Sequence, residues 1–216
     1  MLLFLFLSLQ EMSLFEDTYK TINTPAQGSF RDKGSKFIAF SYPFSEENKL
    51  KDIINEIKSE HPKARHYCYA YRLGMDRSVF RINDDGEPAG SAGRPILNTL
   101  LSNDLTNILV VVVRYFGGTL LGIPGLINAY KSATQEAIAN VLIVEKHQKD
   151  IYEINFDYLQ MNDVMRIIKD ENLDIRNQTF DNDCTLEIAI RTSLINRVIN
   201  NLSAIPNTKT KYMKTI

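Results

Sequence analysis

The pattern of apolar positions between residues 36 and 62 predicts a strand followed by a helix. Residues 36–42 are rich in β-forming side chains, and Pro43 ends that strand. We expect the helix to begin at Ser45, because the two glutamates that follow would then lie in its positive first turn. Its buried face is a stripe at i, i+3, i+4 and i+7 spacing, made by Leu50, Ile53, Ile54 and Ile57.

Residues 65–73 and 78–83 predict a hairpin with its turn at residues 74–77. Period-two alternation puts alternate side chains of the first strand on opposite faces, with His66, Cys68, Ala70 and Arg72 on one and Arg65, Tyr67, Tyr69 and Tyr71 on the other. The density of Gly and Pro at residues 84–95 excludes a regular element. A short helix is expected from Ile96.

Residues 108–113 are an uninterrupted aliphatic run, which is typical of a strand covered on both faces and therefore central in its sheet. The glycine-rich segment 114–125 follows. A helical face then runs from Leu126 to about Asn140.

A second, smaller unit follows a polar bridge at residues 145–149. Tyr152, Ile154 and Phe156 alternate as in a strand, and the later apolar periods indicate the order βαββαβ, which is that of a ferredoxin-like sandwich. We therefore expect an α+β chain with one domain at residues 12–146 and another at residues 147–216.

The first eleven residues are apolar, but no Lys or Arg precedes the apolar run and no small-residue cleavage site follows it. The run is also far shorter than the roughly 20 residues of a spanning helix. We interpret residues 1–11 as a non-native upstream extension, with translation beginning at Met12. A secretory signal is the alternative interpretation.

Composition is that of a soluble globular protein: of the 216 residues, 44% are hydrophobic and 24% charged. Lys and Arg number 25 against 26 Asp and Glu, so no strong positive field favours nucleic acid, and any RNA contact must be a local patch. Cys68 and Cys184 lie far apart without metal-ligand spacing, which favours a reducing cytoplasm over a disulfide framework or zinc site.

The glycine-rich segment is the strongest candidate for chemistry. Glycines allow backbone N–H groups to approach a ligand, and the start of a helix adds unpaired donors, so an anion such as phosphate is favoured there. The segment contains neither a Walker A ending nor a GxGxxG motif. The alternative is that its glycines serve tight turns and close packing.

Asp84, Asp85 and Glu87 place three carboxylates in four positions, which suits a hydrated divalent ion or proton transfer. We favour a structured surface loop instead, because Asp-Asp-Gly makes turns through its own side-chain hydrogen bonds. His66 and Cys68 share a strand face, but no oxyanion donor accompanies them. Cys68 is therefore expected to be a buried small side chain and His66 the polar edge of a groove.

Several basic residues neighbour these segments and would form a positive patch beside Tyr115 and Phe116 if they converge. They are Arg31, Lys33, Lys36, Arg94, Arg114 and Lys131.

Two long motifs in the chain resemble those of the IMPACT/YigZ family. They are Asp-Asp-Gly-Glu-Pro-Ala-Gly-Ser-Ala-Gly-Arg-Pro-Ile-Leu, from residue 84, and Val-Val-Val-Arg-Tyr-Phe-Gly-Gly-Thr-Leu-Leu-Gly-Ile-Pro-Gly, from residue 111. Residues 33–38 and 64–66 also match, and the resemblance spans nearly the whole chain from about Asp17. Ser91 departs from a frequent Thr, and Ile123-Pro124 from a small residue and Gly, so the second motif loses one backbone donor.

The resemblance implies an N-terminal left-handed βαβ domain, similar to a ribosomal protein domain and to domain IV of elongation factor G. It implies a ferredoxin-like C-terminal domain similar to domain V of that factor. Carried over by position, the family's groove comprises Lys36, His66, Asp84, Asp85, Glu87, Arg94, Arg114, Gly117, Gly118 and Lys131. The resemblance brings no catalytic residue, metal or cofactor.

The function it implies is a translation-associated binding protein that contacts the ribosome, structured RNA or a translation factor in the cytoplasm. Eukaryotic members regulate translation initiation under amino-acid starvation through an added N-terminal domain that this chain lacks. The alternative is a small enzyme that holds a phosphorylated or nucleotide substrate at the glycine-rich turn. We favour the binding protein, because no complete catalytic constellation can be assembled from the chain.

Overall fold

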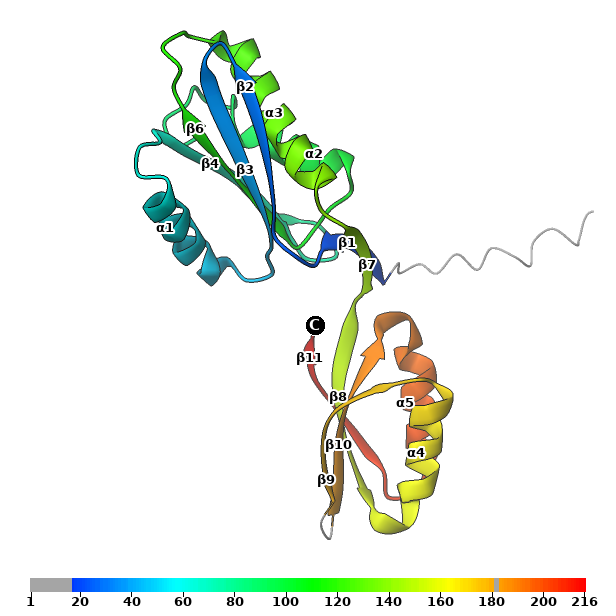
Figure 1. The fold of residues 1–216 in the computed structure, drawn as a ribbon. Helices are drawn as coiled ribbons and strands as arrows, with labels where there is room; N and C mark the ends of the chain where they lie inside the picture. Colours follow the sequence, from blue (N-terminus) through cyan, green and yellow to red (C-terminus); the bar gives the residue numbers. More distant parts are fainter. Residues whose placement is uncertain (1–16, 181–182) are drawn as a thin grey trace, which may run out of the picture. The chain divides into compact units, whose positions relative to one another are not determined.

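The computed structural model describes residues 17–180 and 183–216 and divides the chain into two compact units (Figure 1). One unit is Tyr19–Lys146, and the other consists of residues 147–216 together with residues 17 and 18. The extension expected at residues 1–11 lies outside the described residues. In the described part of the chain, no helix is both long and apolar enough to span a bilayer.

The unit Tyr19–Lys146 is built on a five-stranded sheet in which every neighbouring pair is antiparallel, in the order β2-β3-β6-β4-β5. The strands are β2 (Ala26–Asp32), β3 (Ser35–Pro43), β4 (His66–Leu73), β5 (Val79–Asn83) and β6 (Ile108–Tyr115). The aliphatic run of β6 is the middle strand and is buried along Ile108–Arg114, as its composition predicts. The hairpin predicted from the pattern of residues 65–83 is β4 and β5.

Helices cover both faces of this sheet. α2 (Gly93–Ser102) and α3 (Gly122–Ala139) pack on one face with the Cys68 and Ala70 side chains of β4. α1 (Leu50–Glu60) packs on the other face, where Tyr67, Tyr69 and Tyr71 point. The alternation predicted within β4 is therefore confirmed from His66 onward. Arg65 precedes β4, so the alternation does not place it.

The predicted helix starts at Ser45 and Ile96 are wrong. Glu47–Lys49 forms a 3₁₀ turn, and α1 begins only at Leu50 without a side-chain cap. α2 begins at Gly93, so the end of the segment predicted to be irregular is helical. Pro95 is compatible with that position, because the first turn of a helix needs no N–H from it.

Three strands were not predicted from the sequence. They are β1 (Thr18–Ile22), β2, and β7 (Ile143–His147), of which β1 and β7 form a two-stranded sheet. β2 reads Ala-Gln-Gly-Ser-Phe-Arg-Asp, with a glycine and few β-branched side chains. Gly28 allows β2 to pack closely against α3, because a Cβ at this position would lie only 2.2 Å from the Ala137 backbone nitrogen.

The second unit has the order βαββαβ and the sheet order β11-β8-β10-β9, all antiparallel, which confirms the ferredoxin-like arrangement. α4 and α5 share a core with one face of this sheet. The elements are β8 (Lys149–Asp157), α4 (Met161–Asp170), β9 (Asp174–Phe180), β10 (Asp183–Arg191), α5 (Ile195–Ser203) and β11 (Lys209–Thr215).

Candidate functional site

A cavity of about 390 Å³ lies in the unit Tyr19–Lys146, beside the start of α3. The acid-rich segment supplies Gly86, Glu87 and Pro88, and the glycine-rich segment supplies Arg114, Phe116, Leu120, Leu121, Gly122 and Ile123. Arg65, His66 and Leu126 complete the lining. The two motifs, distant in the sequence, thus share one recessed surface.

A buried ion pair forms part of the cavity wall. β6 directs Arg114 toward the α2 and α3 face, where its Nη1 donates to Glu87 Oε1 at 2.6 Å. Both side chains are almost fully buried, with 6% and 3% of their surface exposed. The Arg114 guanidinium also lies over the rings of Phe37 and Phe116, at 5.4 and 5.7 Å from their centroids. These contacts fix the charged groups against the core.

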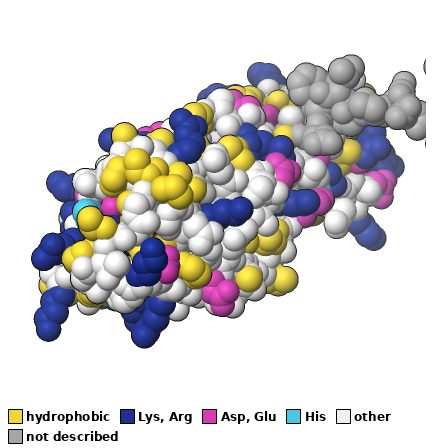
Figure 2. Space-filling view, turned by 90° about the horizontal axis from the view of Figure 1, so that it is seen from above, with side chains coloured by type: hydrophobic (Ala, Val, Ile, Leu, Met, Phe, Trp, Pro, Cys, Tyr) yellow, Lys and Arg dark blue, Asp and Glu magenta, His cyan; other side chains and the backbone are white. Residues whose placement is uncertain are grey.

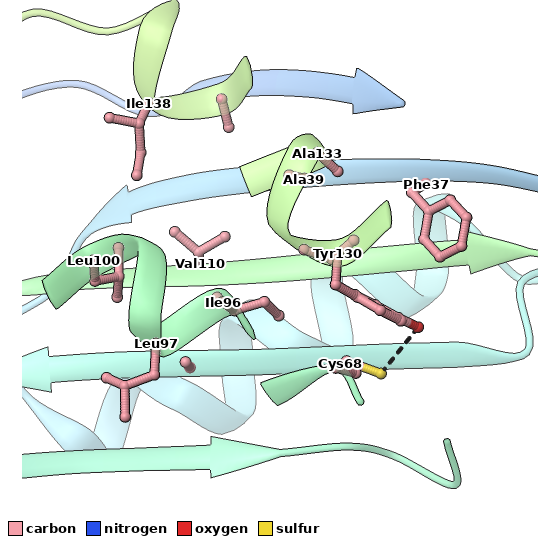
Figure 3. Packing of buried hydrophobic residues seen from close by; sticks show 14 of the residues in the cluster. Phe37, Ala39, Cys68, Ile96, Leu97, Leu100, Val110, Tyr130, Ala133 and Ile138 are labelled. Carbon is pink, nitrogen blue, oxygen red and sulfur yellow. Dashed lines mark hydrogen bonds between the residues drawn. The ribbon is translucent and has the colours of Figure 1, made fainter. Parts of the chain in front are cut away.

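Tyr130 links this pair to Cys68. The Tyr130 hydroxyl, on α3, donates to Glu87 Oε1 at 2.9 Å. Cys68 Sγ lies 3.3 Å from the Tyr130 oxygen, as the dashed line in Figure 3 marks, and 3.0 Å from the Asp84 carbonyl oxygen. Burial raises the pKa of the Cys68 thiol well above its usual range, because desolvation outweighs the Tyr130 hydrogen bond. The thiol is therefore protonated at neutral pH, which argues against a thiol nucleophile.

Asp84 and Asp85 are occupied by the backbone of their own loop. Asp84 Oδ1 accepts from the N–H groups of Ala92 and Gly93 at 3.0 and 2.8 Å, and Oδ2 accepts from Gly90 at 2.9 Å. Asp84 thus binds the otherwise free donors at the start of α2. Asp85 Oδ2 accepts from the Tyr67 N–H at 2.7 Å.

These bonds support the structured loop rather than a cation site. Among the described residues, no group of three or more His, Cys, Asp or Glu side chains is arranged to hold a metal ion.

His66 has a defined orientation at the edge of the cavity. Its Nδ1 lies 2.8 Å from the Asp85 carbonyl oxygen. Because a carbonyl oxygen only accepts, Nδ1 carries the proton in that bond. Nε2 lies 4.0 Å from Glu87 Oε1. The histidine expected at the edge of a groove therefore lines the cavity with its ring orientation fixed by Asp85.

The glycines mostly serve turns and packing. A Cβ on Gly117 would lie 1.9 Å from the Gly34 carbonyl carbon, and the Gly117 N–H already donates to Ser35 Oγ at 3.2 Å. Gly118 has a φ of +89° and open space around it. Of the glycine-rich segment's glycines, Gly122 lines the cavity, and it has a φ of +71° at the start of α3.

The basic residues do not converge into one patch. Arg94 and Lys131 line a second cavity of about 300 Å³. Lys36 pairs in register with Tyr115 on the α1 face of the sheet, opposite Arg114. Tyr115 itself contacts α1's end through a 2.9 Å bond between its hydroxyl and His61 Nδ1, so it does not accompany Phe116. In Figure 2, Lys and Arg side chains are spread among acidic and apolar ones.

Sequence reasoning missed part of the cavity lining. Arg65, Leu120 and Ile123 line the cavity, and no pattern distinguishes an exposed loop leucine as a wall. Tyr130 lies within the helical face expected from Leu126 to about Asn140, and its place in that pattern gives it no role in the site. The signal available was that a buried tyrosine hydroxyl needs a hydrogen-bond partner.

The chain is similar to known proteins in sequence and in fold. The family model of the Impact N-terminal domain matches residues 33–138. An IMPACT family member of Haemophilus influenzae is 33% identical over 173 residues, covering 79% of this chain and 84% of its own. The IMPACT family member YigZ of Escherichia coli is 34% identical over 63% of this chain and 68% of its own. A crystal structure described as a hypothetical protein superposes with a TM-score of 0.70, at 26% identity, over 93% of this chain and 99% of its own.

The cavity and the two-unit α+β fold thus occur in a chain that belongs to the IMPACT family.

Proposed function

We propose that this protein is a cytoplasmic, translation-associated regulatory protein that acts by binding. The surface around the 390 Å³ cavity contacts the ribosome, structured RNA or a translation factor. The observation that carries the proposal is the meeting of the two family motifs at this cavity, with Arg65 exposed at its edge. Membership of the IMPACT family supports the same proposal, because the resemblance to that family implies a translation-associated role.

The chemistry of the site favours binding over reaction. Asp84 and Asp85 are engaged by backbone N–H groups, and the Cys68 thiol is protonated. The groups that face the cavity are the Arg65 cation at its edge, the His66 imidazole, an ion pair without net charge and apolar walls. Such a surface suits contact with a phosphate backbone beside stacked or apolar groups. The remaining groove residues Lys36, Arg94 and Lys131 lie elsewhere on the unit and are secondary contacts in this proposal.

Co-sedimentation with purified ribosomes over a salt titration tests the proposal. The wild type is expected to pellet with ribosomes at low salt and to be released as salt rises, because phosphate contacts release counterions. Arg65→Glu is expected to weaken binding about tenfold or more, because it reverses a charge at the cavity edge. Lys63→Glu is the matched control, since Lys63 is also exposed, lies two residues away and does not line the cavity.

Two results would contradict the proposal. One is the absence of salt-dependent ribosome binding by the wild type. The other is equal binding by Arg65→Glu and Lys63→Glu, which would exclude the cavity edge as the contact surface.

A further inference from the structure

We propose that the 390 Å³ cavity binds a small organic phosphate with a flat ring and a hydroxyl or amino donor, of which a nucleoside monophosphate is the simplest form. This inference goes beyond contact with the ribosome, because it concerns a free ligand. The volume lies within the range of small-molecule sites, about 300–1,000 Å³.

The positive lining selects an anion. Arg65 is exposed at the cavity and has no carboxylate within ion-pair distance among the described residues. Gly122 and Ile123 open the 18-residue helix α3, whose start has no side-chain cap. Pro124 in this first turn has no N–H, so the donors that the positive helix start offers at the cavity are the N–H groups of Gly122 and Ile123. Together they favour a phosphate over a neutral ligand.

Arg114 adds a second hydrogen-bond donor at the cavity. The residue is 5% exposed and lines the cavity, and its Nε is buried without a hydrogen-bond partner among the described residues. Its Nη1 is paired with Glu87, so the guanidinium is held in place by an ion pair and by two aromatic rings. Because Arg114 also lines the cavity, an acceptor atom of a bound anion could satisfy this N–H.

The polar wall requires a donor from the ligand. In the neutral imidazole, the Nδ1–H bond to the Asp85 carbonyl leaves Nε2 of His66 as an acceptor, and the Glu87 carboxylate beside it also accepts. A sugar hydroxyl or a ring amino group of a nucleotide is such a donor. Glu87 Oε1 already accepts from Arg114 and Tyr130, so Nε2 of His66 is the acceptor that the ligand would meet.

The apolar wall suits a flat ring. Phe116, Leu120 and Ile123 are 42%, 82% and 53% exposed, although all three line the cavity. Leu121 and Leu126, both nearly buried, continue this wall inward. Aromatic and aliphatic side chains beside a cation bind the face of a base as well as its phosphate.

The experiment is a titration of the full chain with AMP, with adenosine and inorganic phosphate as half-ligands. Binding is followed by the imidazole NMR signals of the three histidines. His66→Gln assigns the His66 signal. AMP is expected to shift the His66 signal saturably and to leave that of His147 unchanged. Adenosine and phosphate are each expected to bind at least tenfold more weakly.

Leu120→Asp tests the location without disturbing the core, since that side chain is 82% exposed. It places a negative charge at the cavity and is expected to weaken AMP binding tenfold or more. Leu142→Asp, at a site 78% exposed outside the cavity, is the matched control and should bind AMP as the wild type does.

The proposal is overturned if AMP binds no better than its halves, if His66 does not respond, or if the two aspartate variants bind alike. Ribosome binding without AMP binding would leave the translation proposal intact and exclude this one. AMP binding without ribosome binding would do the reverse.

Discussion

Glu87 and Arg114 form a buried ion pair whose two charges depend on each other. Glu87→Gln removes one charge and leaves the Arg114 cation in the core, so we expect the unit Tyr19–Lys146 to lose about 3–5 kcal/mol of stability. Urea unfolding followed by tyrosine fluorescence measures this loss. The same variant keeps the size of the side chain, which separates the charge from the packing.

Glu46→Gln is the control for that experiment, because the Glu46 to Lys49 pair is exposed and contributes little. Its unfolding curve should coincide with that of the wild type. Equal stability of Glu87→Gln and Glu46→Gln would show that the buried pair is not a stabilising contact.

Asp17 is the residue whose titration should be visible in the stability of the second unit. Hydrogen bonds from Arg191, and further ones from Ser193, hold its pKa at about 2 against an ordinary 3.8, although burial opposes them. A lowered folded pKa stabilises the native state above the unfolded pKa, and this contribution is lost as the pH falls from about 4 to 2. The shift corresponds to about 2 kcal/mol at neutral pH.

We therefore expect Asp17→Asn to be less stable than the wild type at pH 7 and equal to it near pH 2. Chemical denaturation at a series of pH values measures both. A constant difference between the two proteins from pH 7 to pH 2 would contradict the ionic origin of the effect.

At the residue scale, the segments that form the site can be predicted from the sequence more reliably than the role of each residue within them. His66, Glu87 and Arg114 were predicted and do line one cavity. Local spacing does not predict that Asp84 turns its carboxylate onto the start of α2, because that bond joins positions eight and nine residues apart through a loop. Nor does it place Lys36 and Arg94 relative to Arg114, since tertiary contacts decide those distances.

At the element scale, two neighbouring glycines have different roles in one turn: Gly117 allows close backbone packing, and Gly118 allows a positive φ. A Cβ on Gly117 would collide with the Gly34 backbone, whereas Gly118 has open space and only a positive φ. Gly118→Ala is expected to cost about 1 kcal/mol through strain, and Gly117→Ala distinctly more, because the β2 to β3 turn must move. Thermal unfolding of both variants measures the difference.

The two alanine variants control each other, since they add the same methyl group one position apart. Equal losses would contradict the close approach of the two turns. A loss confined to Gly118→Ala would show that backbone strain, not packing, decides the role of this turn.

Strong periodicity made most elements predictable. The apolar run of β6, the hairpin β4–β5 and the βαββαβ order of the second unit follow from patterns that burial on one or two faces imposes. β2 and β7 escaped prediction because partly exposed strands with glycine or charged side chains lack that pattern. The observed first residues of α1 and α2 differ from the predicted ones for two reasons. A 3₁₀ turn precedes α1, and the start of α2 is bound by the distant Asp84 in place of a local cap.

At the scale of the whole molecule, the two units have separate apolar cores, one with Leu97 and the other with Leu186. Units with separate cores unfold independently unless their interface couples them. We expect calorimetry to give two transitions. Leu97→Ala and Leu186→Ala each remove a buried side chain and should each cost about 2–5 kcal/mol, in one transition only. Each variant thus serves as the control for the other, and the shifted transition identifies its unit. A single transition that both variants lower equally would contradict independent units. It would mean that a substitution in the ferredoxin-like unit also lowers the stability of the unit that carries the cavity.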